Sequence, residues 1–513
     1  MLFNSYVFLF VFLPVALAGY YAAAHLVGPG AARIWLCLSS FFFYAWWNPV
    51  FVLLLAASVA FNYSLSRWLV GDDRSGPAHQ GAILFAGIAA NLLLLFYYKY
   101  LFPLIGFLHD LGWVAAAGGS LLLPIGISFF TFTQIGYLVD CRQGQVKDRG
   151  LINYVLFVSF FPHLIAGPIL HHREIMPQFA RDETYRVQAR NLAVGLTLFA
   201  VGLAKKVLLA DSVAPSVELG FADLHGIALL PAWSAALGYS MQLYFDFSGY
   251  CDMAIGLGIM FAIRLPLNFN SPYQSLSIID FWQRWHITLT RYLTLLLYNP
   301  LAVWVARARQ RAGLPMNRRA AATPTGFLTL IAFPTFTTVL IAGIWHGAGL
   351  TYVVYGALHG AYLTINHAWR TFRKPLVVPA ELSPAAVCAV AWRWLLTFAA
   401  VLLAEIAFRS PSVSGAVSLV AGMLGLHGTG SPSTMSLLYH SAFVLMLAVV
   451  AFGLPNIYQF LGESSPALTK VTPISWPALT WRPDWRIATA VGILLAITAL
   501  FSQRSTQFLY FQF

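Results

Sequence analysis

Long apolar runs separated by short polar loops repeat along the whole chain. A helix needs about 20 mostly apolar residues to cross a bilayer, with a range of about 17–25. Runs of this kind lie at residues 6–26, 34–65, 82–98, 121–139, 153–170, 192–209, 229–261, 327–345, 351–369, 390–408, 437–454 and 487–501. The pattern therefore predicts an all-α, polytopic transmembrane protein with about 11–13 spans.

Prolines interrupt several of these runs. Pro49 follows Asn48 inside the second run, Pro162 lies between Phe161 and His163, and Pro334 follows Phe333. Proline removes a backbone hydrogen bond and breaks or kinks a helix. A broken helix at membrane depth is tolerated only where protein or a cavity surrounds it. We therefore expect broken or re-entrant helices in the interior.

The composition agrees with a membrane protein. Of 513 residues, 59% are hydrophobic and 9% are charged, against about 25% charged in soluble proteins. We expect one polytopic domain over residues 1–513. The net charge of +12 does not indicate nucleic-acid binding, because the basic residues lie in short loops between apolar runs. The four cysteines are far apart and form no metal-binding motif.

The basic loops predict the topology, because Lys and Arg favour the cytoplasmic side. Five arginines lie between residues 307 and 319 with no acid among them, and another basic group lies at 370–374. Both loops should be cytoplasmic, so the turn of the hairpin at 344–367 should lie away from the cytoplasm. No Lys or Arg precedes Arg33, so we expect a retained first span and an external N-terminus. Arg482 and Arg486 predict that the tail at 502–513 is also external.

Two Trp-His pairs are the first candidates for chemistry. His286 follows Trp285 in the polar segment 264–292, and His346 follows Trp345 at the hairpin turn. Histidine can accept and donate a proton near neutral pH. Two histidines in apolar surroundings therefore indicate a proton-transfer function.

The segment 264–292 should contain a helix that begins near Ser277. Ser277 and Asp280 have the spacing of an N-terminal cap. On one continuous helix Trp282, His286 and Thr290 would share a face, and Asp280 would pair with Arg284. The alternative is an interfacial helix in which Trp and Arg act as anchors.

His346 is followed by Gly347 and Gly349, which would let a ligand or another part of the chain approach closely. The alternative is a tight packing turn whose histidine bonds a carbonyl. His359 should support the site, line another wall or have a structural role. Asp246 is an acid in an apolar run, where it could orient a histidine, pair with an arginine or act in catalysis.

Four ordered motifs carry a resemblance to a known family. They are YFDFSGY at residues 244–250, LNFNSPY at 267–273, DFWQRWH at 280–286 and WHG at 345–347. Together they resemble the membrane-bound O-acyltransferase (MBOAT) family, in particular its bacterial branch that acetylates exopolysaccharides such as alginate. The similarity extends from Met1 to Phe513.

The resemblance implies a transmembrane tunnel with His346 as the catalytic histidine and His286 as its partner. Asn268, Trp285 and Trp345 lie in the same motifs and are candidates for supporting roles. The resemblance also implies acetyl-CoA as the acyl donor, a periplasmic esterase-like O-acetyltransferase partner and a polysaccharide as final acceptor. It places the chain in the bacterial inner membrane. No bound cofactor and no metal are expected.

These residue types suit the chemistry. Acyl transfer from a thioester to an oxygen needs a base, here His346. It also needs a donor for the oxyanion, here His286 or nearby Trp or backbone N–H groups, and a site that excludes water. Three alternatives remain open: a polysaccharide or lipid-precursor transporter or flippase, a scaffold for exopolysaccharide assembly, and an acyltransferase for cellulose, peptidoglycan or D-alanylation.

The C-terminal tail at 502–513 carries a separate hypothesis. Tyr510 is flanked by aromatic residues and should lie outside the cytoplasm. Its hydroxyl could accept the acyl group transiently and pass it to the partner. The alternative is a short amphipathic tail that lies on the bilayer.

Overall fold

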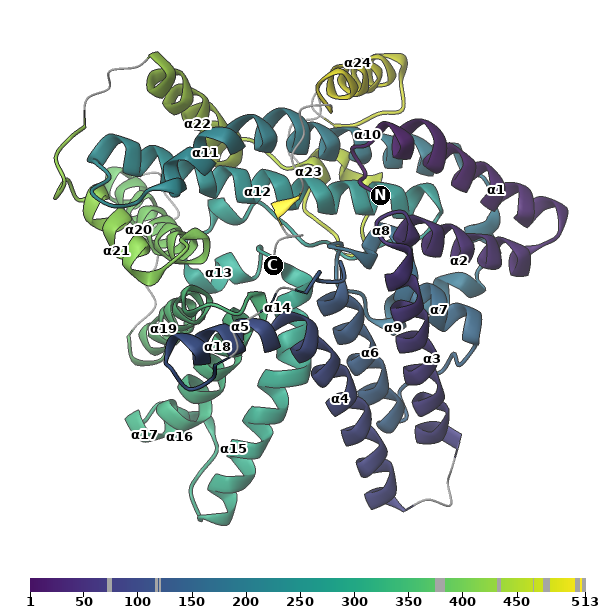
Figure 1. Ribbon diagram of the computed structural model, residues 1–513, viewed down its shortest axis with the longest axis horizontal. Helices are drawn as coiled ribbons and strands as arrows, with labels where there is room; N and C mark the ends of the chain where they lie inside the picture. Colours follow the sequence, from purple (N-terminus) through teal and green to yellow (C-terminus); the bar gives the residue numbers. More distant parts are fainter. Residues whose placement is uncertain are drawn as a thin grey trace. The chain divides into compact units, whose positions relative to one another are not determined.

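The computed structural model describes residues 1–71, 76–115, 119, 121–373, 383–430, 435–464, 466–473, 480–502 and 508–509. Every regular element among these residues is a helix (Figure 1), which confirms the predicted all-α class. Six described helical stretches are long and apolar enough to cross a membrane, judged by length and composition: Phe8–Leu26, Pro49–Val70, Pro77–Lys99, Ala189–Ala222, Pro324–His346 and Pro384–Arg409. Shorter apolar helices accompany them, and the expected 11–13 spans stay a prediction.

The chain forms two compact units, each assembled from separate stretches of sequence. Unit 1 contains Met1–Leu208, Asp246–Leu267 and Asn456–Gln512, and unit 2 contains Leu209–Phe245 and Asn268–Pro455. Helix α12 (Leu229–Met260) and the π-helical turn η4 (Lys205–Ala210) contribute residues to both units. Neither unit is therefore one continuous segment of the sequence.

Unit 1 contains most of the N-terminal helices and the last helix. Their bounds are η1 Phe8–Phe12, α1 Leu13–Leu26, α2 Pro29–Ala45, α3 Pro49–Gly71, α4 Pro77–Lys99, α5 Leu101–Asp110, α6 Ile127–Arg142, α7 Leu151–Ser159, α8 Phe161–Leu164, α9 His172–Ile175, η2 Met176–Ala180, η3 Asp182–Tyr185, α10 Ala189–Ala204, α23 Ile457–Leu461, η8 Gly462–Ser464 and α24 Trp485–Phe501.

Unit 2 contains both Trp-His pairs and the helices next to them. Their bounds are α11 Asp211–Ala222, η5 Pro272–Gln274, α13 Ile278–Trp282, α14 Ile287–Leu293, η6 Thr294–Tyr298, α15 Asn299–Arg311, α16 Arg318–Ala321, α17 Pro324–Phe327, η7 Leu328–Ala332, α18 Phe333–His346, α19 Leu350–Phe372, α20 Pro384–Arg409, α21 Val413–Met423 and α22 Met435–Gly453.

Proline breaks the helices at two of the three expected places. Helix α2 ends before Asn48, and α3 begins with Pro49, as predicted. The expected span at 153–170 is wrong as one helix, because α7 ends at Ser159 and the short α8 follows. The backbone N–H of Phe161 donates to Ser40 Oγ at 3.2 Å instead of to its own helix. At Pro334 the chain stays helical and changes from the π-helical η7 to α18.

Glycines let α10 approach the second half of α12 closely within unit 1. A Cβ atom on Gly195 would lie 2.6 Å from the Gly256 carbonyl oxygen, and one on Gly202 would lie 2.6 Å from the Gly249 carbonyl oxygen. On each helix the two glycines are two turns apart, and they pair in opposite chain order. The helices therefore pack antiparallel with almost no side chain between their backbones, as small residues allow in membranes.

Substituting Gly202 tests this packing. We expect Gly202→Ala to lower the free energy of unfolding by about 1–3 kcal/mol, because the new methyl group meets a backbone oxygen that cannot move aside. A Cβ atom on Gly81 of α4 would meet nothing within 4 Å, and Gly81→Ala should be neutral or slightly stabilising. Denaturant unfolding of both variants in detergent is the measurement, and equal effects would contradict the packing.

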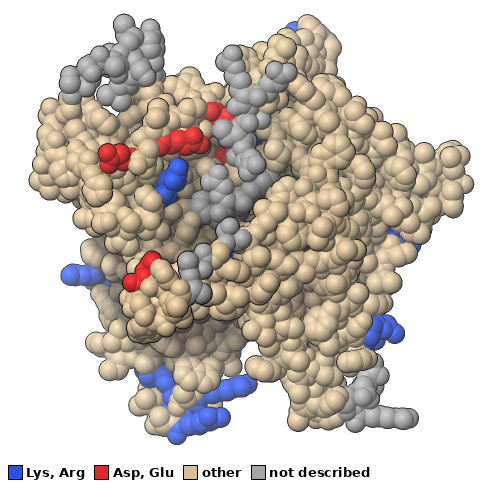
Figure 2. Space-filling model, viewed as in Figure 1, with Lys and Arg blue, Asp and Glu red and all other residues tan. Residues whose placement is uncertain are grey.

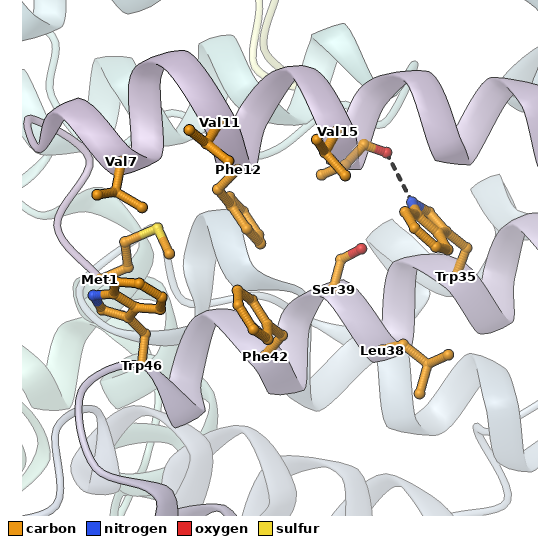
Figure 3. A pocket seen from close by; sticks show the side chains of 11 residues that line it. Met1, Val7, Val11, Phe12, Val15, Trp35, Leu38, Ser39, Phe42 and Trp46 are labelled. Carbon is orange, nitrogen blue, oxygen red and sulfur yellow. Dashed lines mark hydrogen bonds between the residues drawn. The ribbon is translucent and has the colours of Figure 1, made fainter.

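An apolar groove of about 400 Å³ separates η1 and α1 from α2 (Figure 3). Val11, Val15, Leu38 and Phe42 line it, and each is more than half exposed. The Trp35 indole N–H donates to the Ala16 carbonyl oxygen at 3.0 Å and closes one end. Such a lining is typical of a surface that faces lipid rather than water.

The arginine-rich segment of unit 2 comprises the end of α15, the connection after it and the start of α16. Figure 2 shows Lys and Arg side chains gathered at this end of α15. Arg309 is the buried member, and its guanidinium donates to the Pro315 carbonyl oxygen at 2.9 Å and to Thr329 Oγ1 at 2.9 Å. The exposed arginines of this segment are the kind of basic residues that favour the cytoplasmic side.

Candidate active site

His346 is the last residue of α18, where the chain turns toward α19. Its side chain is buried, with 6% exposed, and packs edge-on against Tyr355 of α19 and Phe408 of α20, with ring centroids 5.9 and 5.3 Å away. The neighbouring Trp345 ring lies 4.8 Å from the imidazole. Three helices therefore hold His346 in an aromatic pocket from which bulk water is largely excluded.

The turn after His346 is tight, as expected, but the two glycines differ. A Cβ atom on Gly347 would lie 2.1 Å from the Tyr352 ring, whereas Gly349 has room for one. One turn before the histidine, a Cβ atom on Gly343 would lie 2.5 Å from the Cα of Gly356. Close packing of α18 against α19 therefore explains Gly343 and Gly347, and Gly349 is not needed for it.

His286 is also buried, with 1% exposed, but the predicted helical stripe through it is wrong. Ser277 caps the helix as expected and accepts from the Asp280 N–H at 3.2 Å, and Arg284 pairs with Asp280 at 2.8 Å. Helix α13 ends at Trp282, however, and α14 begins at Ile287. His286 lies between them in the left-handed region, at φ 44° and ψ 51°, so it shares no helical face with Trp282.

Backbone pairing with the preceding segment explains this break. The Ile287 N–H donates to the Asn268 carbonyl oxygen at 3.0 Å, and the Asn270 N–H donates to the Arg284 carbonyl oxygen at 3.0 Å. These bonds replace part of the helical ladder. A left-handed conformation costs a non-glycine residue about 1–2 kcal/mol, and such strain clusters at functional sites.

Asn268 determines which ring nitrogen of His286 carries hydrogen. Its side-chain oxygen Oδ1 accepts from the Thr288 backbone N–H at 3.2 Å, which identifies that atom as the amide oxygen. The same oxygen is 3.1 Å from His286 Nδ1. Nδ1 must therefore donate to it, which leaves the lone pair of the neutral ring on Nε2. A neutral His286 is thus a proton acceptor at Nε2.

His359 lies on α19 one turn after Tyr355 and links the two Trp-His regions. Its ring centroid is 4.7 Å from that of Tyr355, which in turn contacts His346. Its Nδ1 accepts from the Trp282 indole N–H at 3.2 Å. His359 therefore lies between the two Trp-His regions, and its supporting role stays a prediction.

Trp285 is buried beside His286 and stacks on two other rings. Its centroid lies 5.7 Å from Phe281 and 6.1 Å from Tyr273, with interplanar angles of 15° and 19°. Tyr273 belongs to the same polar segment as Asn268. The motif residues therefore form one aromatic layer that includes Trp285, the residue directly before the strained His286.

Asp246 has a different role from the histidines. It belongs to unit 1, whereas His286 and His346 belong to unit 2. Its Oδ1 lies 2.7 Å from Lys206 Nζ, and its Oδ2 accepts from the Leu509 N–H at 3.0 Å. The expected histidine or arginine partner is therefore wrong, because Asp246 pairs with a lysine and also holds the described part of the C-terminal tail. Tyr510 lies outside the described residues.

Removing the Asp246 side chain tests this tail contact. Asp246→Ala leaves the buried Lys206 without its carboxylate, so the free energy of unfolding should fall by about 3–5 kcal/mol. The C-terminus should also become sensitive to carboxypeptidase. The double variant Asp246→Ala/Lys206→Ala should recover part of the stability, and Asp110→Ala at an exposed acid is the control. An unchanged digestion rate in Asp246→Ala would contradict the contact.

The described residues contain one group with metal-ligand chemistry, formed by Asp140, His171 and His172 in unit 1. Both imidazole Nε2 atoms lie 2.8–2.9 Å from Asp140 Oδ2. His171 Nδ1 accepts from the Arg173 backbone N–H at 3.4 Å, so Nε2 of the neutral ring carries the hydrogen. Burial opposes ionisation of Asp140, but hydrogen bonds from both histidines outweigh it and hold the pKa of this carboxyl below its usual range. We interpret the group as a hydrogen-bonded contact that joins α6 to the start of α9.

Sequence reasoning missed several polar residues that are buried or half-buried. Lys205 and Lys206 pair with Asp252 and Asp246 in unit 1. In unit 2, Glu405 bonds to Tyr273 at 2.9 Å. A lone acid in the apolar run 390–408 was a signal that could have identified Glu405.

Comparisons with known proteins agree with this architecture. The sequence model described as "MBOAT, membrane-bound O-acyltransferase family" matches residues 127–313. The chain is 36% identical to a peptidoglycan O-acetyltransferase of Helicobacter pylori, over all of this chain and 98% of that relative. It is 34% identical to the probable alginate O-acetylase AlgI of Pseudomonas aeruginosa, over the full length of both chains.

A more distant similarity covers half of the chain. A teichoic acid D-alanyltransferase of Bacillus subtilis is 26% identical over 50% of this chain and 62% of that relative. The full-length similarities decide the class of protein. The chain belongs to the membrane-bound O-acyltransferase family, and it is a multi-pass membrane O-acyltransferase.

Proposed function

We propose that this chain moves an acetyl group from acetyl-CoA on the cytoplasmic side, across the bacterial inner membrane, to an envelope polysaccharide. A periplasmic esterase-like partner would complete the transfer. The observation that carries the chemistry is the pair of buried histidines in unit 2, with contacts from His346 through Tyr355 and His359 to Trp282, in the same motif as His286. The full-length similarity to two relatives named as O-acetylating enzymes supports acetyl as the acyl group.

In the proposed reaction, His346 takes the proton of the acceptor hydroxyl as its oxygen attacks the thioester carbonyl. The carbon–sulfur bond breaks, an ester bond forms, and the proton leaves with the CoA thiol. His286 acts beside it. Because its Nδ1–H is committed to Asn268, His286 can stabilise the oxyanion only when Nε2 is protonated. Both histidines are buried near aromatic side chains, which keeps water away and limits hydrolysis of the thioester.

Alginate is the final acceptor that we propose first, and peptidoglycan is the nearest competitor. The relatives with full-length similarity are named for these two polymers. D-alanylation has weaker support, since the corresponding relative matches half of the chain. Deleting the gene in its host and measuring acetyl groups on each purified polymer by mass spectrometry distinguishes the acceptors.

We also propose external N- and C-termini and a cytoplasmic α15–α16 loop. The exposed arginines on the ends of α15 and α16 that flank this loop support the orientation. We further propose a transmembrane tunnel through the protein and a transient acyl relay through the Tyr510 hydroxyl. Tyr510→Phe should abolish transfer to the partner if the relay exists, and intact transfer would contradict it.

Purified full-length protein in nanodiscs with radiolabelled acetyl-CoA tests the activity. An acyltransferase releases CoA thiol and transfers label to an acceptor. A transporter or flippase would instead move substrate without releasing thiol, and a scaffold would do neither. Absence of thiol release with the partner and polymer present would contradict the proposal.

A further inference from the structure

Glu405 is a buried acid that the proposed mechanism does not use. It lies on α20 within one of the membrane-spanning stretches, with 3% of the residue exposed. Arg409 follows four residues later, but its guanidinium lies over the rings of Phe221 and Tyr239, at 5.2 and 6.0 Å from their centroids. Among the described residues, no basic side chain forms a salt bridge with Glu405. An acid in such a place is expensive and indicates a function.

The contacts of Glu405 centre on the Tyr273 hydroxyl group, and the Ser240 side chain also interacts with the carboxyl group. The oxygen of Tyr273 is 2.9 Å from Glu405 Oε1, 2.9 Å from Ser240 Oγ and 2.9 Å from the Ser240 carbonyl oxygen. Ser240 and Tyr273 are buried as well. All three residues belong to unit 2.

Counting hydrogens decides the protonation state that fits this geometry. A tyrosine hydroxyl has one hydrogen and two lone pairs. The carbonyl oxygen of Ser240 can only accept, so the Tyr273 hydrogen goes to it. Ser240 Oγ–H then donates to one lone pair of the tyrosine oxygen. The last short contact has a hydrogen only if Glu405 itself donates. An ionised Glu405 would leave one of the oxygen pairs without a hydrogen between them.

The second carboxyl oxygen leads to the same conclusion. Glu405 Oε2 is buried and has no hydrogen-bond partner among the described residues. Leaving a carboxylate oxygen unpaired in a dry interior costs far more than leaving a neutral carboxyl oxygen unpaired. The neighbours that interact electrostatically with Glu405 include the hydroxyl groups of Tyr239 and Tyr355. None of these groups carries the positive charge that a buried carboxylate needs.

We propose that Glu405 is a neutral carboxylic acid and a positioning residue for both histidines. Through Tyr273 it holds the ring that stacks on Trp285, next to His286. Through α20 it holds Phe408, less than one turn away, against His346. The effect on turnover rests on the proposed acyl transfer, whereas the protonation state does not.

Infrared difference spectroscopy tests the protonation state without any activity. The spectrum of Glu405→Gln subtracted from that of the wild type at neutral pH should show the C=O stretch of a neutral carboxyl group. Glu183→Gln, at an exposed acid on η3 outside the membrane-spanning stretches, should show none. A carboxylate band in place of the carboxyl band for Glu405→Gln would overturn the proposal. This result would be independent of whether the protein releases CoA.

Kinetics test the positioning role. Glu405→Gln keeps a neutral donor for Tyr273, and its kcat and KM should match the wild type within about threefold. Glu405→Ala and Tyr273→Phe should each lower kcat by about 10- to 100-fold, because the reacting groups are misplaced. The KM for acetyl-CoA should change little. The kcat of the double variant Glu405→Ala/Tyr273→Phe should be no lower than that of either single variant. Loss of activity in a folded Glu405→Gln would overturn the proposal, because it would mean that the charge is required.

Discussion

His346→Ala should lower the rate of CoA release by about 10²–10⁴-fold, the contribution typical of a positioned general base. The imidazole is buried against Tyr355 and Phe408, so few other groups can reach the same hydroxyl proton. Single-turnover release of CoA from radiolabelled acetyl-CoA is the measurement. The KM for acetyl-CoA should change little, because the lost interaction acts in the transition state.

Two controls separate catalysis from folding in this experiment. His346→Gln fills most of the pocket without a titratable ring, and should be as inactive as His346→Ala but more stable. His25→Ala replaces an exposed histidine of α1 and should retain full activity. Unaltered turnover in a folded His346→Ala protein would remove His346 from the role of base.

His286→Asn should lower turnover by about 10²-fold or more while leaving the fold intact. Asparagine tolerates the left-handed conformation that His286 adopts better than most residues, so the break between α13 and α14 should persist. His286→Ala should be equally inactive and also less stable, since alanine tolerates this conformation poorly and leaves a cavity beside Asn268. Thermal unfolding and CoA release, measured together, distinguish the two variants.

The bond from His286 to Asn268 adds a finer test. Asn268→Ala removes the acceptor that keeps hydrogen on Nδ1, so turnover should fall even though both histidines remain. Thr288→Val is the matched control, because it removes one donor to the same amide oxygen and leaves the His286 bond in place. Equal activity of Asn268→Ala and the wild type would show that the tautomer of His286 does not matter.

Several features were predictable because they depend on local chemistry. The run 229–261 corresponds to α12, the run 390–408 to α20 and the cap at Ser277 to the start of α13. Length, apolarity and capping act over a few residues, so one sequence is enough to predict them. The same argument failed at 153–170, where the Ser40 hydroxyl on a distant helix satisfies the backbone that Pro162 disrupts.

The environment of His286 shows the limit of such reasoning. Helical periodicity placed it on a face with Trp282, but backbone bonds to Asn268 and Asn270 break the helix there. A periodic pattern contains no information about a segment that competes for the same N–H and C=O groups. The partner of Asp246 could not be predicted for a similar reason, because Lys206 is 40 residues away in the sequence.

By itself, the sequence determined an all-α membrane protein and its family, and it predicted two candidate histidines, because apolar length and short motifs are properties of neighbouring residues. Only the tertiary structure decided the tautomer of His286, the aromatic links from His346 through His359, the lysine partner of Asp246 and the buried contacts of Glu405. Each of these depends on hydrogen-bond donors and acceptors from distant segments meeting in a dry interior, where an unpaired polar group is costly.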